Sequence, residues 1–247
     1  MRQSDFRRFG SNLAPIFGAL VALCAPAVAN PKVVIDSGHG GSNLGAQGAV
    51  ETLREKNLTL TLATQVAAKL RARSIDVTMT RTTDRTLTLR QRVAVANNVP
   101  ADLFVSIHAN ASFTRAQRGY ETYLLTPHAV DVDGRALRHD TTTPRQNVDA
   151  DIALVLDDVE RGAAQWESAE LATRMQRSIR VRRGPEGDRG VRQDSQHVLL
   201  GATMPAVLVE VGFIDHPIEG RELADPNIQA RLVDAIVEAI TEQLADS

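Results

Sequence analysis

The sequence predicts one α/β domain in which helices cover both faces of a twisted, mostly parallel sheet. Short apolar runs bounded by glycine and polar turn residues alternate with longer segments whose apolar residues recur every fourth position. A chain of 247 residues with 43% hydrophobic content is large enough to bury one sizeable core. The formal net charge of −2 and the aromatic content of 4% give neither a basic field nor a base-stacking surface, so we expect no nucleic-acid partner.

The N-terminal segment has the pattern of a cleaved signal peptide. Arginines precede an apolar run at 13–25, and Ala27-Val28-Ala29 supplies the small residues that a signal peptidase prefers. The apolar run is too short to cross a bilayer as a mature helix. We therefore expect residues 1–29 to be removed and the domain to comprise residues 30–247, exported to the periplasm without a stable membrane anchor. The single cysteine, Cys24, is lost with this segment, so a tight metal site must use histidines and carboxylates.

Residues 32–48, KVVIDSGHGGSNLGAQG, predict a buried strand that ends in a glycine-rich turn. Glycine lets the backbone bend sharply and lets a bulky group approach it closely. His39 would then lie at the carboxyl end of the strand, where open α/β sheets place their ligands. Two interpretations of His39 remain at this point: a metal ligand, or a turn histidine that faces water.

The next segment predicts a helix that packs on the sheet. One apolar stripe recurs at four-residue spacing, formed by Leu58, Leu62, Val66 and Leu70. Thr52 and Glu55 have the spacing of a capping box, which would place Glu55 in the first helical turn. Glu55 is therefore either a carboxylate that satisfies the helix N-terminus or a metal ligand aimed at the strand ends.

A second strand with a histidine at its carboxyl end follows. Residues 75–80 alternate apolar and polar residues as a strand does, and residues 87–98 have helical spacing. The apolar run 103–107 then ends in His108. Two histidines at the ends of strands that could lie side by side favour a shared metal site.

The middle of the chain is polar and irregular. Residues 119–125 predict a strand near the edge of the sheet, and residues 126–183 form an insertion that begins as a loop. Within it we predict an acidic, amphipathic helix at 149–161 and a second helix at 168–183, ended by the glycines that follow.

A third strand delivers a charged side chain near its carboxyl end. This strand is 206–211, AVLVEV, and its charged residue is Glu210. A carboxylate in an apolar strand costs several kcal/mol if it is buried without a partner. We therefore expect a partner, a metal or a catalytic role for Glu210. Residues 228–244 predict a long closing helix.

His39, Glu55, His108 and Glu210 form one candidate site. Two histidines and one carboxylate with an open position are the ligand set of a catalytic zinc site. A second carboxylate beside them can deprotonate the attacking water and pass the proton to a leaving amine. The spacing alone selects neither zinc nor the substrate.

Five ordered segments carry a resemblance to a known family. They are VVIDSGHGGSNLGAQG, REKNLTL, TMTRTTD, ADLFVSIHAN and MPAVLVEVGFID. Together they resemble the zinc-dependent N-acetylmuramoyl-L-alanine amidases, bacterial cell-wall enzymes of the type found in daughter-cell separation. The resemblance implies that His39, Glu55 and His108 bind one Zn²⁺. It implies that Glu210 is catalytic, and that the substrate is the amide between N-acetylmuramic acid and L-alanine in peptidoglycan.

The resemblance is incomplete at two places. Family members often continue GFISN where this chain has Asp215-His216 after GFI, and Gln196-His197 replaces apolar or aromatic residues. These positions belong to the rim of the expected groove, so they affect substrate detail and not the chemistry. We expect the remaining histidines to be loop residues and not ligands: His128, His139, His197 and His216.

In the division-associated members of the family, a helix between the equivalent strands covers the zinc and an activator displaces it. The segment 149–161 resembles that element in position and composition. The resemblance implies that one of Asp157, Asp158 or Glu160 blocks the metal, and that a periplasmic activator protein is a partner. The alternative is a surface helix that packs on the fold.

Two other functional classes remain open. A zinc peptidase acting on wall peptides would share the metal chemistry, and a catalytically idle wall-binding module would keep the groove. A glycosidase would need two carboxylates that flank a sugar bond and no metal.

Overall fold

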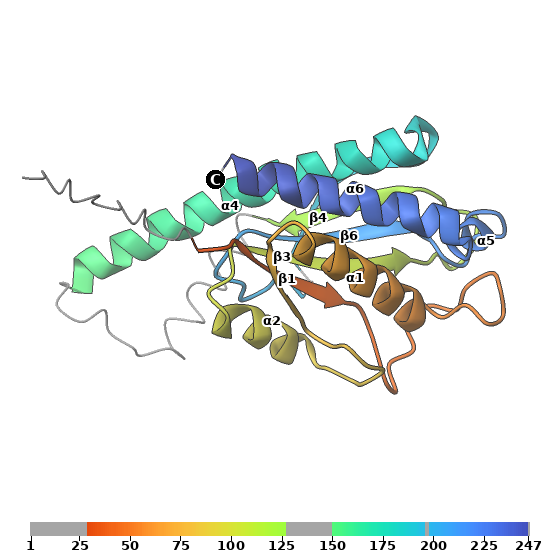
Figure 1. Ribbon diagram of the computed structural model, residues 1–247, viewed down its shortest axis with the longest axis horizontal. Coiled ribbons are helices and arrows are strands. Elements are labelled where there is room, and N and C mark those ends of the chain that lie inside the picture. Colours follow the sequence, from red (N-terminus) through yellow and green to blue (C-terminus); the bar gives the residue numbers. More distant parts are fainter. Residues whose placement is uncertain (1–28, 127–149, 196–197, 247) are drawn as a thin grey trace, which may run out of the picture.

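The computed structural model describes residues 29–126, 150–195 and 198–246. Within these ranges six strands form one sheet in the order β2-β1-β3-β6-β4-β5 (Figure 1). The elements in chain order are β1 Lys32–Ser37, α1 Glu55–Arg71, β2 Asp76–Met79, α2 Leu89–Asn98, β3 Leu103–Asn110, β4 Tyr120–Leu125, α4 Ala150–Arg183, the short 3₁₀ helix η1 Pro185–Gly187, β5 Asp188–Asp194, β6 Ala206–Phe213, α5 Glu219–Leu223 and α6 Pro226–Ala245. The predicted signal peptide lies outside the described residues, apart from its last position.

The sheet is mostly parallel, as predicted. Strands β2, β1, β3 and β6 all run in one direction. Strand β4 runs antiparallel to β6, and β5 is parallel to β4. The carboxyl ends of β1, β3 and β6 therefore meet at one end of the sheet, so side chains that follow these strands can converge there.

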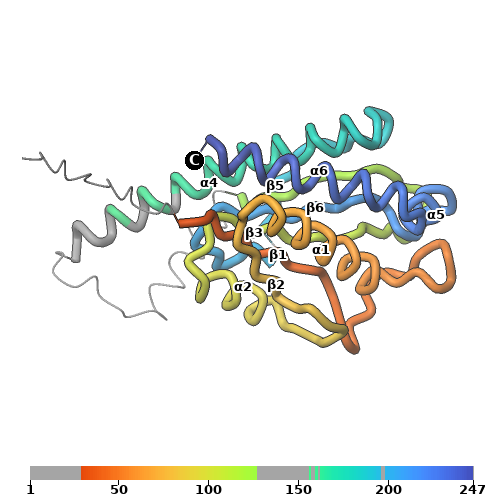
Figure 2. Tube along the Cα trace, in the orientation of Figure 1, coloured from red at the N-terminus to blue at the C-terminus, as the bar shows by residue number. Residues whose placement is uncertain are grey.

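Three long helices cover one face of the sheet. Helices α1, α4 and α6 lie together on this side (Figure 2). Leu62, Leu171 and Ile236, one from each helix, are completely buried against the strands. The predicted stripe of α1 is confirmed, because all four of its apolar residues belong to this core. Burying one such side chain stabilises the fold by about 1.5–3 kcal/mol.

The opposite face has a smaller cover. Val93 and Ala96 of α2 pack with Val198 and Leu199 on the first half of the strands. Closer to the carboxyl ends, the strand residues that point to this face are polar. This arrangement leaves the end of the sheet accessible from the α2 side, and the candidate site lies there.

The strand predicted at 119–125, near the edge of the sheet, is confirmed as β4, which lies between β6 and the edge strand β5. The true edge, β5, has the sequence DRGVRQD and contains only one apolar residue. An edge strand of this kind is held by backbone hydrogen bonds on one side and needs no apolar alternation. Its polar composition therefore concealed it in the sequence.

The two helices predicted at 149–161 and 168–183 are one continuous helix, α4. Gly162 lies inside it, although glycine in a helix interior costs up to about 1 kcal/mol relative to alanine. Gln165 Nε2 donates to the carbonyl oxygen of Leu125 (2.7 Å), and Ser168 Oγ accepts from the amide of Ala206 (2.9 Å). These contacts attach α4 at the amino-terminal end of β6, so its earlier residues extend beyond the sheet, away from the carboxyl ends of β1 and β3 (Figure 1).

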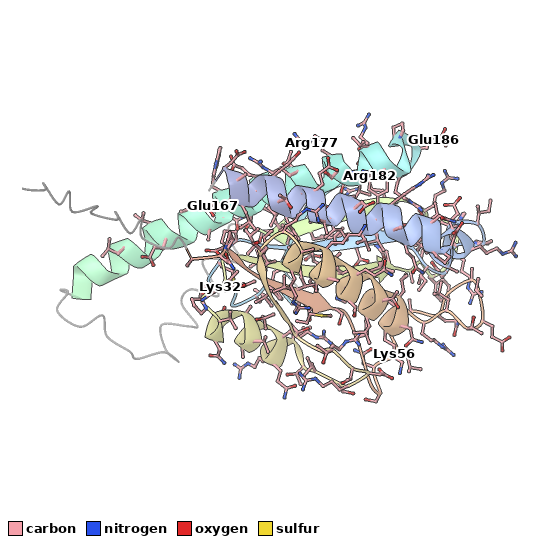
Figure 3. The ribbon with its side chains drawn as sticks, viewed as in Figure 1. Lys32, Lys56, Glu167, Arg177, Arg182 and Glu186 are labelled. Carbon is pink, nitrogen blue, oxygen red and sulfur yellow. The ribbon has the colours of Figure 1, made fainter. Side chains whose placement is uncertain are left out.

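Ion pairs join the second half of α4 to α6. Arg182 Nη2 lies 2.9 Å from Glu238 Oε2, and Arg177 pairs with Glu242. Figure 3 shows both arginines along α4. In the described ranges, no helix has the combination of length and apolarity needed to cross a membrane.

Candidate metal centre

His39 follows β1 in a left-handed backbone conformation, with φ of 59°. Its ring nitrogen Nδ1 lies 2.9 Å from Oδ1 of Asn43. Because an amide oxygen only accepts, Nδ1 donates this bond, which leaves Nε2 as the nitrogen available to a metal. Nε2 faces Glu55, whose Oε1 is 2.9 Å away. An imidazole fixed through its other nitrogen in this way is typical of metal-ligating histidines.

Glu55 is the first residue of α1, and its carboxylate points back to the strands. The capping-box prediction for Glu55 with Thr52 is wrong: the N-cap is Arg54, and no side-chain cap forms. Glu55 Oε2 accepts from the amide of Ala46 (2.8 Å), while Oε1 accepts from the amide of Ala109 (3.1 Å). Both oxygens are oriented by backbone amides, so the carboxylate has one defined position.

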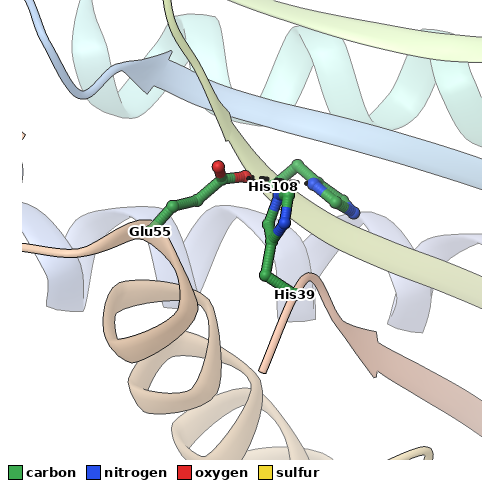
Figure 4. A group of neighbouring side chains, drawn as sticks. All are labelled: His39, Glu55 and His108. Atoms are coloured by element: carbon green, nitrogen blue, oxygen red, sulfur yellow. Dashed lines mark hydrogen bonds and ion pairs between the residues drawn. The ribbon is translucent and has the colours of Figure 1, made fainter. Parts of the chain in front are cut away.

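His108, near the end of β3, completes the group. Its Nδ1 lies 3.0 Å from Glu55 Oε1, so a single carboxylate oxygen faces both imidazoles (Figure 4). The two rings are 5.0 Å apart at an angle of 73°. One potential ligand atom from each of His39, Glu55 and His108 lies within 4.8 Å of the others. We call these three residues the metal-binding set.

The close approach of the His108 ring to the turn requires glycine at position 38. A Cβ atom there would lie 2.4 Å from Cε1 of His108, far inside any tolerated contact distance. The glycine-rich turn recognised in the sequence thus has a specific purpose: it admits the second histidine.

The electrostatics of the set favour an ionised carboxylate. Burial alone would raise the pKa of Glu55, but the hydrogen bonds with His108 and His39 outweigh it and hold the pKa well below its usual range. Burial would lower the pKa of His108, yet the bond to Glu55 and the charge of Glu210 raise it. A cation bound between the three side chains would take the place of the imidazole protons and stabilise the ionised carboxylate of Glu55.

Glu210 lies beside the metal-binding set on β6, in register with His108 of β3. Its Oε2 is buried and, within the described residues, has no hydrogen-bond partner. Burial raises the pKa of Glu210 to about 8; His108 opposes this shift, and Glu55 and Glu121 add to it. A buried carboxyl group with an unused oxygen and a pKa near neutrality is suited to proton transfer.

Glu121 is the neighbour of Glu210 on β4, and it differs from Glu210 in being saturated. It accepts from Asn110 Nδ2 (2.8 Å), the hydroxyl of Tyr123 (3.1 Å) and Nε of Arg189 (3.0 Å). With all of its oxygens engaged, Glu121 has a structural role, and Glu210 is left as the free carboxyl group of the pair.

A cavity of about 410 Å³ is lined in part by Glu121, the neighbour of Glu210. Its lining includes Asn110, Ser112, Gln117, Arg189 and Phe213. Arg189 stacks on the ring of Phe213 at 4.9 Å. Arg189 has no recognisable pattern in the sequence, because its strand β5 is polar and is defined by pairing with β4. The cavity offers hydrogen-bonding side chains beside the site, as a binding groove for a polar polymer requires.

Three of the predicted residues are not brought to this site. Asp157, Asp158 and Glu160 belong to the part of α4 that precedes Gln165, at the other end of the sheet. A blocking carboxylate in this segment stays a prediction, and it needs a different placement of the helix.

The remaining histidines agree with the predictions where they can be compared. His216 lies in the turn after β6, and its Nδ1 accepts from the amide of Glu219 (3.1 Å), so it is a loop residue. The other three lie outside the described residues: His128, His139 and His197.

The donor atoms of the metal-binding set fit zinc. Two imidazole nitrogens and one carboxylate oxygen are the ligand types of catalytic zinc sites, which keep a fourth position open. Within the described residues, Oε2 of Glu210 has no hydrogen-bond partner, so it can accept from a further polar group.

Comparison with known proteins now identifies the family. Residues 33–242 match the family described as N-acetylmuramoyl-L-alanine amidase. The chain belongs to this family. It is 31% identical to the N-acetylmuramoyl-L-alanine amidase AmiA of Escherichia coli (strain K12) over 216 residues, which cover 84% of this chain and 74% of AmiA. It is also 31% identical to the uncharacterised YqiI of Bacillus subtilis (strain 168) over 223 residues, 89% of each chain.

Solved amidase structures have the same fold. The catalytic domain of CwlV from Bacillus (Paenibacillus) polymyxa superimposes with a TM-score of 0.67 at 32% identity, covering 88% of this chain and 99% of that domain. An amidase from Clostridium difficile 630 gives a TM-score of 0.70 at 29% identity, covering 89% of this chain and 100% of the other. The family and the α/β fold predicted from the sequence are both confirmed, and the chain is an N-acetylmuramoyl-L-alanine amidase of the peptidoglycan-acting kind.

Proposed function

We propose that this amidase is zinc-dependent and cleaves the amide bond between N-acetylmuramic acid and the L-alanine of the peptidoglycan stem peptide. One observation carries the proposal: potential ligand atoms of His39, Glu55 and His108 lie within 4.8 Å of one another. Glu210 lies on the neighbouring strand beside them, in register with His108.

His39, Glu55 and His108 would hold the Zn²⁺ through Nε2, Oε1 and Nδ1. When bound, Zn²⁺ acts as a Lewis acid that polarises the substrate carbonyl and makes water a stronger nucleophile. Asn43 fixes the His39 tautomer, while the backbone amides of Ala46 and Ala109 orient Glu55. The chain thus places its donor atoms before any ion arrives.

Glu210 would move the proton in this reaction. Its Oε2 would accept a proton from the attacking water and give it to the amide nitrogen as the carbon–nitrogen bond breaks. The protonated amine of L-alanine and the carboxylate of muramic acid are then the products. Burial next to Glu55 and Glu121 keeps the proton affinity of this carboxyl group high enough for the second transfer.

We further propose that the protein is exported and acts in cell-wall remodelling, including daughter-cell separation. The pattern of residues 1–29 supports export, and the periplasm is the expected compartment. Residues 126–183 would form a regulatory insertion in domain 30–247, with a periplasmic activator as partner. Deleting residues 148–165 raises activity under this proposal, and unchanged or lost activity counts against autoinhibition.

Digestion of purified sacculi tests the reaction. The chain without residues 1–29 should release intact stem peptides with a free L-alanine amino group, detected by mass spectrometry. EDTA should abolish the release and Zn²⁺ should restore it. Fragments cut inside the peptide would instead identify a zinc peptidase. Binding to sacculi without any release would identify an idle wall-binding module.

A further inference from the structure

Two buried arginines behind the glycine-rich turn have no role in the chemistry proposed above. Arg81 follows β2 in the TMTRTTD segment, and Arg92 belongs to α2. Arg81 is 1% exposed and Arg92 is 3% exposed. Both guanidinium groups end against the backbone of residues 37–39, which leads into the metal-binding set.

Arg92 contacts this backbone at two carbonyl groups. Its Nη1 donates to the carbonyl oxygen of Ser37 and its Nη2 to that of His39, both at 2.6 Å. Nη1 also pairs with the Asp36 carboxylate at 2.7 Å. Two hydroxyl groups donate to the same carboxylate, those of Thr80, which follows β2, and of Ser106 in β3. Three acceptors therefore fix the guanidinium group of Arg92: the carbonyl oxygens of Ser37 and His39 and the carboxylate of Asp36.

Arg81 contacts the same turn and also the beginning of α1. Its Nε donates to the carbonyl oxygen of Ser37 (3.0 Å), and its Nη2 donates to the carbonyl oxygens of Gly38 (2.8 Å) and Lys56 (2.9 Å). Lys56 follows Glu55 directly. Arg81 therefore connects the turn that carries one ligand to the helix start that carries another.

The backbone of His39 needs such support. A φ of 59° places it in the left-handed region, which is unfavourable for a residue with a Cβ atom. Conformations of this kind persist when the surroundings over-determine them. All three carbonyl groups of residues 37–39 accept from Arg81 or Arg92. The two guanidinium groups therefore over-determine the left-handed conformation of His39. The conformation in turn decides where the imidazole points.

Stability alone is a poor explanation for these two side chains. Burying a guanidinium removes it from water, and a buried ion pair rarely repays this fully. Asp36 is the partner of Arg92, while in the described ranges Arg81 forms no salt bridge. Apolar side chains of similar volume would fill the same space at a smaller solvation penalty. Fixing the three carbonyl groups, however, requires donors with a rigid fork geometry, which arginine supplies.

We propose that Arg81 and Arg92 are positioning residues that hold His39 in its left-handed conformation, and so present Nε2 to the metal, in the metal-free protein. The inference rests on the proposed metal-binding set. Neither arginine touches substrate or metal. Their effect on the reaction passes entirely through the placement of His39.

The first test compares zinc affinity in Arg92→Lys and Arg174→Lys. Lysine keeps the charge but cannot reach the carbonyl groups of Ser37 and His39 together. Arg174 is a matched control: it also joins a carbonyl group and a carboxylate, those of Glu242 (3.1 Å) and Asp246 (2.7 Å), far from the site. We expect Arg92→Lys to weaken Zn²⁺ binding by about 10- to 100-fold, and Arg174→Lys to leave it within about twofold. Equal affinities in the two folded variants would overturn the proposal.

Two further measurements distinguish a positioning role of the arginines from a purely structural one. Unfolding by urea measures the stability that each variant loses. The visible spectrum of the Co²⁺-substituted protein reports ligand geometry in the folded fraction. We expect Arg92→Lys to change this spectrum, and Arg81→Lys serves as the second variant. Loss of stability with an unchanged Co²⁺ spectrum and an unchanged zinc affinity would mean that the arginines only support the fold.

A measurement on the unaltered chain keeps the proposal testable if both variants fail to fold. Backbone chemical shifts of His39 report its conformation in the metal-free protein. We expect left-handed shifts before Zn²⁺ is added and little change afterwards. Shifts that become left-handed only with Zn²⁺ would contradict the proposal. An unaltered chain that binds no Zn²⁺ would instead overturn the metal site itself, whatever the shifts of His39.

Discussion

The two faces of the sheet are built from the same strands but have different chemistry. One residue near the end of each central strand lies under the long helices: Ile35, Ile107 and Val209. The residue after each of these is polar and points to the other face: Asp36, His108 and Glu210. Because strand side chains alternate, adjacent positions serve separate purposes. The covered face provides stability, whereas the α2 face carries His108 and Glu210, which meet His39 and Glu55, the first residue of α1, in the candidate site.

The different extent of helix packing on the two faces explains why the candidate site lies at the carboxyl ends of the strands. Helices α1, α4 and α6 pack along the whole of one face, whereas α2 covers only the first half of the other. Polar groups at the carboxyl ends of the strands can therefore be partly buried and still be reached from outside. Substitutions at adjacent positions of one strand should therefore affect stability on the covered face and catalysis on the α2 face.

The largest expected effect is on catalysis, at Glu210. Glu210→Gln removes the proton acceptor while keeping the shape of the side chain, so we expect turnover to fall by roughly 10³-fold with Zn²⁺ still bound. Hydrolysis of sacculi and metal content of the same sample measure the two quantities. Substantial activity in this variant would show that Glu210 does not transfer the proton. It would also contradict the proposed division of stability and chemistry between the two faces of the sheet.

The counterpart on the covered face is Ile107, which precedes His108. Ile107→Ala leaves a cavity under the helices, so we expect the free energy of unfolding to fall by about 2–5 kcal/mol with little change in zinc affinity. Urea unfolding and zinc titration of the folded variant check this. A loss of zinc binding without a loss of stability would show that the two faces are not separable at this strand.

The next prediction concerns the pH dependence of folding stability in the metal-free protein, which should report the ionisation of Glu210. Its pKa is raised from 4.5 to about 8, chiefly by burial, so between these pH values the unfolded chain releases a proton that the folded chain keeps. Stability should therefore fall as pH rises, by roughly 1.4 kcal/mol for each pH unit in this window. Glu210→Gln should remove this slope and be relatively more stable at pH 8 than at pH 5. Parallel stability curves for the two proteins would show that the carboxyl group is not buried in its neutral form.

The smallest effect is expected in α4, where it extends past the covered face. A Cβ atom at Gly162 would meet nothing within 4 Å, whereas one at Gly220 would lie 2.1 Å from the carbonyl oxygen of Ile214. We expect Gly162→Ala to stabilise the protein by about 0.5–1 kcal/mol and Gly220→Ala to destabilise it. Thermal unfolding of the two variants is the measurement. Destabilisation by Gly162→Ala would mean that this part of α4 has contacts that depend on glycine.

The central strands, and the proximity of the candidate site residues, could be predicted because each has a local pattern. Apolar runs that end in His39, His108 or Glu210 are visible without any partner strand. The two interpretations of Glu55 could not be separated from the sequence, because helix capping and metal binding both place a carboxylate in the first turn. Its contacts with Ala46 and Ala109 orient the carboxylate toward the strands, and its role as a metal ligand stays a proposal.

Other features depend on contacts that leave no local pattern. Strand β5 has one apolar residue and is defined by its pairing with β4. Helix α4 continues through Gly162 because the helix on either side of it is long enough to absorb one weak position. The positions of Arg81 and Arg92 behind His39 require the turn, the end of β2 and α2 to be assembled. A charged residue that is buried by assembly looks like a surface residue in the sequence.

The most direct test is a crystal structure of the protein grown with Zn²⁺, with anomalous data collected at the zinc edge. The account predicts one strong peak, about 2.0–2.2 Å from His39 Nε2, Glu55 Oε1 and His108 Nδ1, with Glu210 beside it and not bound as a fourth protein ligand. A peak at another place, or no peak between these three side chains, would contradict it.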